Sequence, residues 1–308
     1  MDLGKAVSEV LEFSLIGCLK DRTSLIYAGI TFVIYSIFGI GMLVSISNLF
    51  TPLTTMGANA NPQLVIGMLI GIYSMLAIYM IPLVLIFTLI GYLMIGRALK
   101  ASKRKYMPLT VVRYIKYLFL PLVAGIIAGL SLYNIKWLWM LVVGLALILG
   151  GAVIAVMGNF LGGVLSAIGM LVLVLYFIVV LYNSLRLSIG EAIFVEGEGV
   201  INSLKKSWVI TKGRVWTVVL ISIILAIVLM VISMIFTIPS AAYSMMYMFS
   251  TIATVGTNPS TMPGIGYLSD PGYLIAILPS YLASAYAILV GSWFTVGLYN
   301  VLTKGKKK

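Results

Sequence analysis

Histidine is absent from this chain, cysteine occurs once, and only eight of the 308 residues are acidic. Without histidine, the chain lacks the commonest metal ligand in proteins and the commonest general base. The single cysteine, Cys18, excludes an intramolecular disulfide bond and a CxxC metal site. Its position on the apolar face of the first helical segment predicts a buried structural thiol. We therefore expect a non-enzymatic protein with no catalytic residues, no cofactor and no metal site.

Charged residues of both signs are also scarce. They make up 9% of the chain, against about 25% in a typical soluble domain, while 62% of the residues are hydrophobic. Residues 23–96 form a run of 74 positions without one Asp, Glu, Lys or Arg. A helix crosses the hydrocarbon core of a bilayer with about 20 apolar residues, so this run alone can hold two spans and a turn. The composition predicts an all-α integral membrane protein, in which residues 1–308 form a single polytopic membrane domain.

Three stretches have the spacing of amphipathic helices that lie on a membrane surface. In the first 22 residues, apolar and small side chains recur on one helical face: Leu3, Val7, Val10, Leu11, Ser14 and Cys18. Residues 107–121 show a similar pattern. In residues 200–212, Ile201, Leu204 and Trp208 share a face, while the lysines point away from it.

Long apolar segments follow these stretches. A polar turn with Pro52 and Pro62 is predicted to end the first span, and Pro82 and Pro279 predict kinks within later ones. The predicted spans cover residues 24–48, 64–96, 117–133, 138–157, 164–185, 215–247 and 271–302.

The basic residues predict the orientation of the spans. Nineteen of the 20 Lys and Arg residues lie in four segments: three in 1–22, seven in 97–116, five in 186–214 and four in 304–308. Because cytoplasmic loops are enriched in Lys and Arg, both termini and both internal basic segments are predicted to be cytoplasmic. An even number of crossings must then separate 97–116 from 186–214, so the three apolar pieces between them cannot all cross.

A short repeat suggests how the spans pair. Leu181-Tyr182-Asn183-Ser184-Leu185 recurs as Leu298-Tyr299-Asn300-Val301-Leu302, and each copy lies where a span meets a basic segment. We interpret the chain as three pseudo-repeat units, 1–100, 101–190 and 191–308, each with a cytoplasmic amphipathic helix and a two-span hairpin. This gives six transmembrane helices in three hairpins. The surplus piece 138–157, with Lys136 at its edge, would be re-entrant. The alternative of seven spans would place one basic segment outside the cell.

Small-residue motifs predict close packing of the helices. GxxxG spacing occurs at Gly67/Gly71, Gly125/Gly129 and Gly158/Gly162. Small residues let helix backbones approach each other within a membrane. We interpret these pairs as internal packing sites, with homodimerisation as the alternative.

Few residues offer catalytic or ion-binding chemistry. Glu191, Glu196 and Glu198 form the closest acid cluster and could bind a divalent cation or act as acid and base. The other interpretation is that Glu196 and Glu198 precede a helix over 200–212 and interact favourably with its dipole. The centres of the predicted spans hold no Asp, Glu, Lys or Arg, which disfavours a proton-driven carrier.

The segment 196–216 carries a motif: Glu196, Gly197, Ser207, Trp208, Thr211, Gly213 and Trp216. Its spacing resembles a signature of the glycerophosphoryl diester phosphodiesterase membrane-domain family and of related prokaryotic membrane proteins of unknown function. The resemblance implies a polytopic membrane module in which these residues are structural. Ser207 and Trp208 would dock a surface helix against the bundle, and Gly213 would end that helix. The diesterase chemistry of the family uses histidine, which this chain lacks, so the enzymatic activity is not expected to transfer.

Two functions fit such a protein. The leading hypothesis is a lipid-interacting protein or a membrane partner of another protein, because amphipathic stretches coincide with a basic cytoplasmic surface. Anionic headgroups are the expected partners, with Lys103, Arg104, Lys105, Lys205 and Lys206 as the contacts. A membrane-protein partner or a homo-oligomer is the further expectation; no nucleic acid is expected, because residues flanking the spans account for the net charge of +12.

The alternative function is a transporter or permease-like module for a small or lipidic substrate. The pseudo-repeats and the kinked spans favour it. Under either hypothesis the expected location is the cell membrane, with a multi-pass topology.

Overall fold

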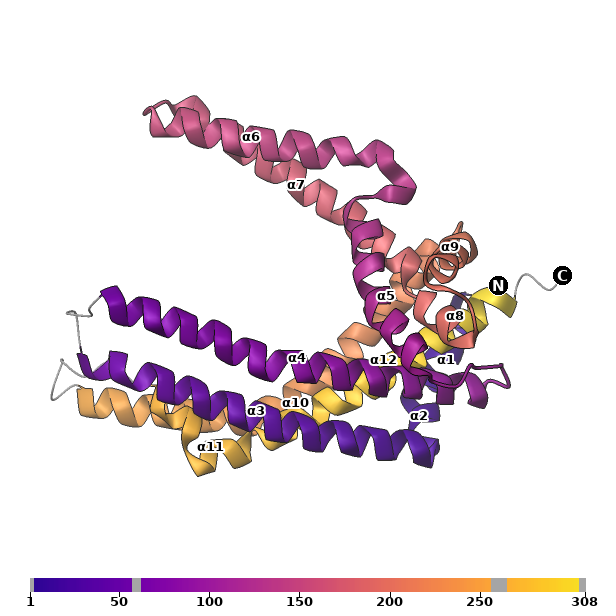
Figure 1. Cartoon of the computed structure of the whole chain (residues 1–308), viewed down its shortest axis with the longest axis horizontal. Coiled ribbons are helices and arrows are strands. Elements are labelled where there is room, and N and C mark those ends of the chain that lie inside the picture. The colour runs from indigo at the N-terminus through magenta and orange to yellow at the C-terminus, as the bar shows by residue number, and fades with distance from the viewer. Residues whose placement is uncertain (1–2, 57–61, 256–264, 305–308) are drawn as a thin grey trace. The chain divides into compact units, whose positions relative to one another are not determined.

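The computed structural model describes residues 3–56, 62–255 and 265–304, and it is helical throughout these ranges except for short connections (Figure 1). The elements are α1 (Leu3–Leu11), the π-helix η1 (Glu12–Gly17), α2 (Cys18–Lys20), α3 (Arg22–Met56), α4 (Pro62–Ala101), α5 (Val111–Gly129), the 3-10 helix η2 (Leu132–Trp137), α6 (Leu138–Val156), α7 (Phe160–Leu187), α8 (Gly190–Glu196), α9 (Val200–Thr211), α10 (Val215–Val255), the 3-10 helix η3 (Ile265–Ser269), α11 (Pro271–Ala276) and α12 (Leu278–Lys304). The prediction of an all-α protein is confirmed.

Seven helical segments within the described ranges are long and apolar enough to cross a membrane, judged by length and composition: Arg22–Leu49, Ile70–Ala101, Val111–Gly129, Ile135–Val156, Phe160–Glu196, Val215–Thr251 and Pro271–Lys304. All seven predicted apolar pieces therefore contain a long helix, although α5 ends at Gly129, before the predicted end at 133, and Ser131 has φ +51°. The segment expected to be re-entrant is among the seven, and the six-crossing topology stays a prediction.

Two helices continue further than predicted. Helix α3 runs to Met56 through Pro52, where the sequence predicted a turn from residue 49. Helix α10 runs to Val255, beyond the predicted end at 247. Uncharged polar residues do not stop a helix that is already propagating, because each added residue gains a hydrogen bond without a new nucleation cost. The rest of the two predicted turns, 57–61 and 256–264, lies outside the described residues.

The proline predictions have different outcomes. Pro82 lies inside α4, as expected for a kink. Pro279 is the second residue of α12, and the preceding helix α11 has already ended at Ala276. The last predicted span is thus broken at Ile277 rather than kinked, since proline is tolerated in the first turn of a helix, where no backbone N–H is needed.

The first helical segment buries a narrower face than predicted. Ala6, Val10, Ser14 and Cys18 are buried at a spacing of four residues, whereas Leu3 is exposed. The four-residue spacing runs through the π-helix η1, whose wider turn keeps such residues in line. The prediction of a buried Cys18 is confirmed.

The chain forms two compact units. Unit 1 comprises Met1–Val10, Leu99–Ser222 and Thr295–Lys308; unit 2 comprises Leu11–Ala98 and Ile223–Phe294. Each unit combines residues that are distant in the sequence, so the units cut across the three pseudo-repeats.

In unit 2, helix α3 lies antiparallel to α12. The Trp293 indole Nε1 donates to Ser24 Oγ at 3.2 Å, and the Tyr35 and Tyr281 rings stack with their centroids 6.3 Å apart. Helix α4 contacts α3 in the same antiparallel sense: Tyr35 stacks on Phe87 with centroids 4.5 Å apart, and Ser45 Oγ lies 3.0 Å from the Tyr79 hydroxyl oxygen. Large aromatic side chains thus fill the space between these helices.

In unit 1, α6 and α7 form a close antiparallel pair, which Figure 1 shows side by side. Glycines seven residues apart make the contact: Gly144 and Gly151 on α6, Gly162 and Gly169 on α7. A Cβ atom on Gly151 would lie 2.6 Å from the Gly162 carbonyl oxygen, and one on Gly169 would lie 2.8 Å from that of Gly144. Only glycine fits at these positions, because a side chain would collide with the backbone of the facing helix.

The predicted GxxxG pairs are used only in part. Gly162 packs internally, but Gly158 lies in the turn before α7 with φ +75° and a side chain there would contact nothing. A Cβ atom on Gly125 or Gly129 would likewise meet open space. The internal interpretation therefore fits Gly162, whose partner in spacing is Gly169 rather than Gly158.

Candidate functional site

The basic segments that the sequence separates come together in unit 1. Arg104 Nη1 forms an ion pair with Glu196 Oε1 at 3.1 Å, and its Nε donates to Asn300 Oδ1 at 2.7 Å. The Tyr299 ring lies under the same guanidinium, 4.1 Å from Arg104 Cζ, and the Tyr299 hydroxyl donates to Glu196 Oε2 at 2.6 Å. Arg104 therefore joins the 97–116 segment, the end of α8 and the C-terminal part of α12.

Two further contacts complete this convergence. Arg214 Nη1 donates to the Leu302 carbonyl oxygen at 2.8 Å, which links the start of α10 to α12. Lys304 forms an ion pair with Glu9 of α1. Residues of all four basic segments therefore lie around the C-terminal part of α12 within unit 1: Arg104 contacts Asn300, Arg214 contacts Leu302, and Lys304 itself contacts Glu9.

Helix α9 is docked through Arg186, at the end of α7. The Arg186 guanidinium stacks on the Trp208 ring, with Cζ 3.6 Å from the centroid, and its Nη2 donates to the Trp208 carbonyl oxygen at 2.7 Å. In return, the Arg186 carbonyl oxygen accepts from Ser207 Oγ at 2.7 Å and from Thr211 Oγ1 at 3.2 Å. Ser207 and Thr211 are fully buried. Three motif residues therefore meet at one arginine.

The remaining motif residues lie at the ends of helices. Gly197 has φ +146° directly after α8, and Gly213 has φ +77° two residues after the end of α9, conformations that favour glycine. Trp216 is 85% exposed at the start of α10.

The buried face of α9 differs from the predicted one. Ser203, Leu204, Ser207, Ile210 and Thr211 are buried, whereas Ile201 is 62% exposed, on the same side as Lys205. The small hydroxyl residues are buried because they contact the Arg186 backbone, a partner that no local pattern reveals.

The three glutamates do not form one site. Glu196 belongs to the network of Arg104 and Tyr299, and Glu198 forms an ion pair with Lys206 at 3.1 Å. Glu191 Oε2 accepts from the Tyr117 hydroxyl at 3.3 Å. For the dipole interpretation, Glu198 does stand two residues before α9, whereas Glu196 is the last residue of α8, at the negative end of that helix.

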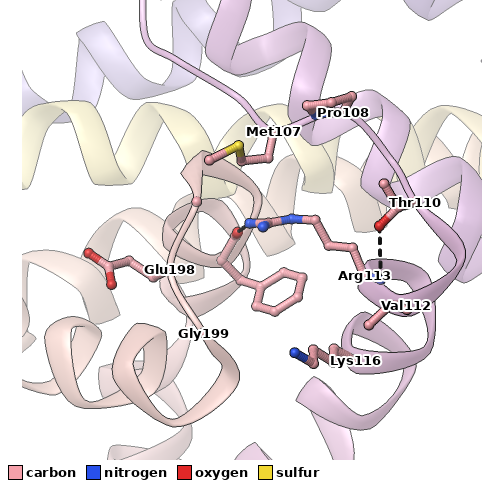
Figure 2. Close-up of a pocket in the computed structure, with 10 residues that line it drawn as sticks. Met107, Pro108, Thr110, Val112, Arg113, Lys116, Glu198 and Gly199 are labelled. Carbon is pink, nitrogen blue, oxygen red and sulfur yellow. Dashed lines mark hydrogen bonds between the residues drawn. The ribbon is translucent and has the colours of Figure 1, made fainter.

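A pocket of about 400 Å³ opens beside this region, within unit 1. The segment 107–110, helix α5, the second half of α8 and the turn 197–199 form its walls. Its lining residues are Met107, Pro108, Thr110, Val112, Arg113, Lys116, Phe194, Gly197, Glu198 and Gly199. In Figure 2 the Arg113 side chain extends from α5 across the pocket, and Lys116 lies one turn further along the same helix. We call this cavity the basic pocket.

Local structure explains the geometry of the basic pocket. Thr110 caps α5 through its Oγ1 atom, which accepts from the Arg113 backbone N–H at 3.3 Å. Arg113 Nη2 donates to the Phe194 carbonyl oxygen, and its Cζ lies 4.8 Å from the centre of the Phe194 ring. The Met107 backbone N–H donates to the Val195 carbonyl oxygen at 2.9 Å and holds the opposite wall.

The pocket has a positive electrostatic character. Arg113 and Lys116 line it, and in Figure 2 the carboxylate of Glu198 points away from them. That carboxylate forms an ion pair with Lys206. Helix α9 begins at the pocket wall without a capping side chain, so the positive end of its dipole adds to the field. This arrangement suits an anionic oxygen-rich group.

The predicted lipid-contact residues lie in different surroundings. Lys103, Lys105, Lys205 and Lys206 are exposed, whereas Arg104 is half-buried and its guanidinium contacts other side chains of the chain.

Sequence reasoning missed Arg186 as a docking residue. Its only sequence signal is that it directly follows the Leu181–Leu185 repeat copy.

No curated protein and no solved structure matches this chain. The resemblance of residues 196–216 to the glycerophosphoryl diester phosphodiesterase membrane-domain signature stays a prediction. A family model does match, over residues 22–300, and the chain therefore belongs to the family described as a domain of unknown function, DUF7847.

Proposed function

We propose that this protein is a non-enzymatic integral membrane protein that binds anionic lipid headgroups at the cytoplasmic face through the exposed sides of α5 and α9. The observation that carries the proposal is that both helices present cations and large apolar side chains together on the exposed side. Such a mixed face is typical of helices that lie in the interfacial region of a membrane.

Helix α9 shows this mixture most clearly. Ile201 is 62% exposed and Val209 is 54% exposed, and Lys205 lies between them at a spacing of four residues. On α5, Val112 and Ile115 are exposed beside Lys116. The apolar side chains can enter the acyl boundary while the lysines meet lipid phosphates.

The basic pocket supplies a defined place for one phosphate group. Its cations, Arg113 and Lys116, come from the first two turns of α5, and Glu198 is paired elsewhere. We exclude Arg104 from the binding surface, because its guanidinium is occupied by Glu196, Tyr299 and Asn300.

We further propose six crossings with both termini in the cytoplasm. The convergence of the four basic segments in unit 1 supports this topology, because residues in contact lie on the same side of a membrane. It disfavours the seven-span alternative, in which one basic segment would lie outside.

The surplus segment in this topology is α5 rather than 138–157. Helix α6 packs along α7 through glycines, so the two fit a hairpin that crosses together. In α5 only 13 residues separate Lys116 from the end at Gly129, a length of about 20 Å against a hydrocarbon core of about 30 Å. We infer that α5 lies partly in the interface and does not cross.

Lipid titration tests the proposed function. The protein in phosphatidylcholine nanodiscs is titrated with dioctanoyl phosphatidylglycerol, and binding is followed by microscale thermophoresis. Lys116→Ala and Lys205→Ala should each weaken binding about fivefold, since one lysine near a headgroup contributes about 1 kcal/mol. Lys136→Ala, whose ammonium lies 5.5 Å from the centre of the Trp137 ring, is the matched control. Unchanged binding in both test variants would refute the proposal.

The transporter or permease-like module remains the alternative because the last span is interrupted at Ile277. Interrupted helices free backbone groups that can bind a substrate. Proteoliposomes with a fluorescent phospholipid in one leaflet separate the two functions: transfer between the leaflets above the rate of protein-free vesicles would favour the transporter.

A further inference from the structure

An apolar groove of about 550 Å³ lies within unit 2, between α3, α10 and α12. The groove is lined by Leu19, Leu25, Ala28, Gly29, Ile232, Phe236, Leu282, Ala283, Ala285, Tyr286 and Leu289. We propose that it holds one acyl chain of a phospholipid whose phosphate binds Lys20 and Arg22. The groove shares no residue with the basic pocket, so this proposal goes beyond the function proposed above.

Small residues create the space in the groove. Ala28 and Gly29 on α3 line it together with Ala283 and Ala285 on α12, and a Cβ atom added to Gly29 would have no neighbour within 4 Å among the described residues. The volume lies within the range of about 300–1,000 Å³ that is usual for ligand sites.

The interior of the groove is apolar. Its one side-chain hydroxyl belongs to Tyr286, which donates to the Leu15 carbonyl oxygen at 3.3 Å. Burying a ligand hydroxyl or amide there would cost its hydration without a compensating hydrogen bond. A hydrocarbon chain carries no such cost, and the walls belong to three helices that are membrane-span candidates.

The charges at one end of the groove identify the rest of the ligand. Leu19 and Leu25 are the lining residues nearest the start of α3, and Lys20 and Arg22 lie beside them in the chain, both exposed. Within the described part of the chain, neither cation makes an ion pair. An anionic group next to the acyl chain would therefore be attracted to this end.

Asp21 does not neutralise these cations, although it lies between them in the sequence. Its Oδ1 accepts from Arg97 Nη2 at 2.7 Å, and its Oδ2 accepts from Ser24 Oγ at 2.7 Å. Lys20, Arg22 and Arg97 carry three positive charges against the one negative charge of Asp21, which leaves a local charge of +2. A phosphodiester attached to an acyl chain complements both the groove and this charge.

Native mass spectrometry of the delipidated full chain tests the proposal, with dioleoyl phosphatidylglycerol as the probe. The wild-type protein should bind one tightly held lipid in addition to weaker ones. Gly29→Leu fills the groove and should weaken this binding at least tenfold. The matched control is Gly67→Leu on α4, because a Cβ atom there also has no neighbour within 4 Å but lies outside the groove.

The charged end is tested with the double variant Lys20→Ala, Arg22→Ala. It should lower the preference for dioleoyl phosphatidylglycerol over dioleoyl phosphatidylcholine at least tenfold, while the double variant Lys136→Ala, Lys212→Ala, which removes two exposed cations elsewhere in the chain, leaves that preference unchanged. Wild-type binding in Gly29→Leu, equal losses in Gly29→Leu and Gly67→Leu, or full competition by glycerol 3-phosphate alone would overturn the proposal. The headgroup titration of Lys116 and Lys205 variants has no part in these outcomes, so the two proposals can fail separately.

Discussion

At the scale of single residues, Arg186 shows how a cation can be buried at the end of a long apolar helix. Arg186 as a whole residue is 7% exposed. Its guanidinium stacks on the Trp208 ring and donates to the Trp208 carbonyl oxygen. Burial of a charge is favourable only with such partners, and arginine offers a plane as well as donors.

We predict that Arg186→Lys lowers the free energy of unfolding by about 2 kcal/mol. The lysine ammonium keeps the positive charge, but it lacks the flat guanidinium that lies over the Trp208 ring and the Nη2 group that donates to the Trp208 carbonyl oxygen. Thermal unfolding in detergent, followed by tryptophan fluorescence, measures the change. Lys212→Ala, at an exposed position just after α9, is the control and should leave the transition unchanged. A wild-type transition in Arg186→Lys would show that the stacking is not stabilising.

Asp21 carries a pH dependence of stability. The hydrogen bond from Arg97, assisted by those from Ser24, lowers the pKa of the Asp21 carboxyl to about 2, against an ordinary value of 3.8. Because the folded state holds the proton less tightly than the unfolded state, the stabilisation is complete above pH ~4. It is lost as the pH falls through the folded pKa near 2.

We therefore predict that wild-type protein loses about 2 kcal/mol more stability between pH 5 and pH 2 than Asp21→Asn does. Unfolding temperatures measured across this range give the comparison. Glu12→Gln, at an exposed position, should follow the wild-type curve. Parallel curves for wild type and Asp21→Asn would contradict the assignment of this linkage to Asp21.

At the scale of elements, the α6–α7 pair depends on glycines that face each other. A Cβ atom on Gly162 would collide with the Ala155 backbone nitrogen, whereas one on the neighbouring Gly163 would contact nothing. The two positions differ by one residue and therefore point to different sides of α7.

Gly162→Leu should separate α6 from α7 and lower the free energy of unfolding by about 1–3 kcal/mol, the usual cost of overpacking. Gly163→Leu adds the same side chain to the same helix. It should lower the free energy of unfolding by less than about 0.5 kcal/mol, the usual limit for substitutions at exposed sites. Thermal unfolding of both variants gives the comparison. Equal destabilisation of the two variants would indicate that helix propensity, and not the close packing of α6 against α7, determines the change in stability.

At the scale of the whole molecule, the proposed topology can be read by thiol labelling. Burial raises the pKa of Cys18 to about 11, so the native thiol stays protonated and unreactive near neutral pH. Cysteines introduced elsewhere can then be labelled selectively in the otherwise unchanged chain.

We predict that Lys103→Cys and Lys205→Cys react with a membrane-impermeant maleimide only from the cytoplasmic side, whereas Met157→Cys reacts only from the opposite side. Met157 is 77% exposed and lies at the turn between α6 and α7. Right-side-out and inside-out membrane vesicles provide the two sides. Labelling of Met157→Cys from the cytoplasmic side would make the α6–α7 hairpin re-entrant.

Local properties of the sequence account for the predictions that the structure confirms. Hydrophobicity is a property of consecutive residues, so the seven apolar pieces were all identified as helical. Gly213 was identified as a helix end because a left-handed residue after a helix favours glycine whatever surrounds it. The same local reasoning placed Cys18 in the interior.

Non-local contacts account for what the sequence alone did not reveal. Arg104 and Glu196 are 92 positions apart, and Tyr299 and Glu196 are 103 apart, so charge counting treated Arg104 as one more surface cation. The buried face of α9 was misjudged for the same reason, since Ser207 and Thr211 are buried by their bonds to Arg186.

The sequence by itself therefore determined the class of the protein, its helices and the excess of cations outside the spans, because these depend on composition and on neighbours along the chain. Only the tertiary structure decided which cations are occupied by internal partners and which remain exposed around the basic pocket and the groove. The physical reason is that a charge is neutralised by whatever lies within a few ångströms, and the fold sets that distance.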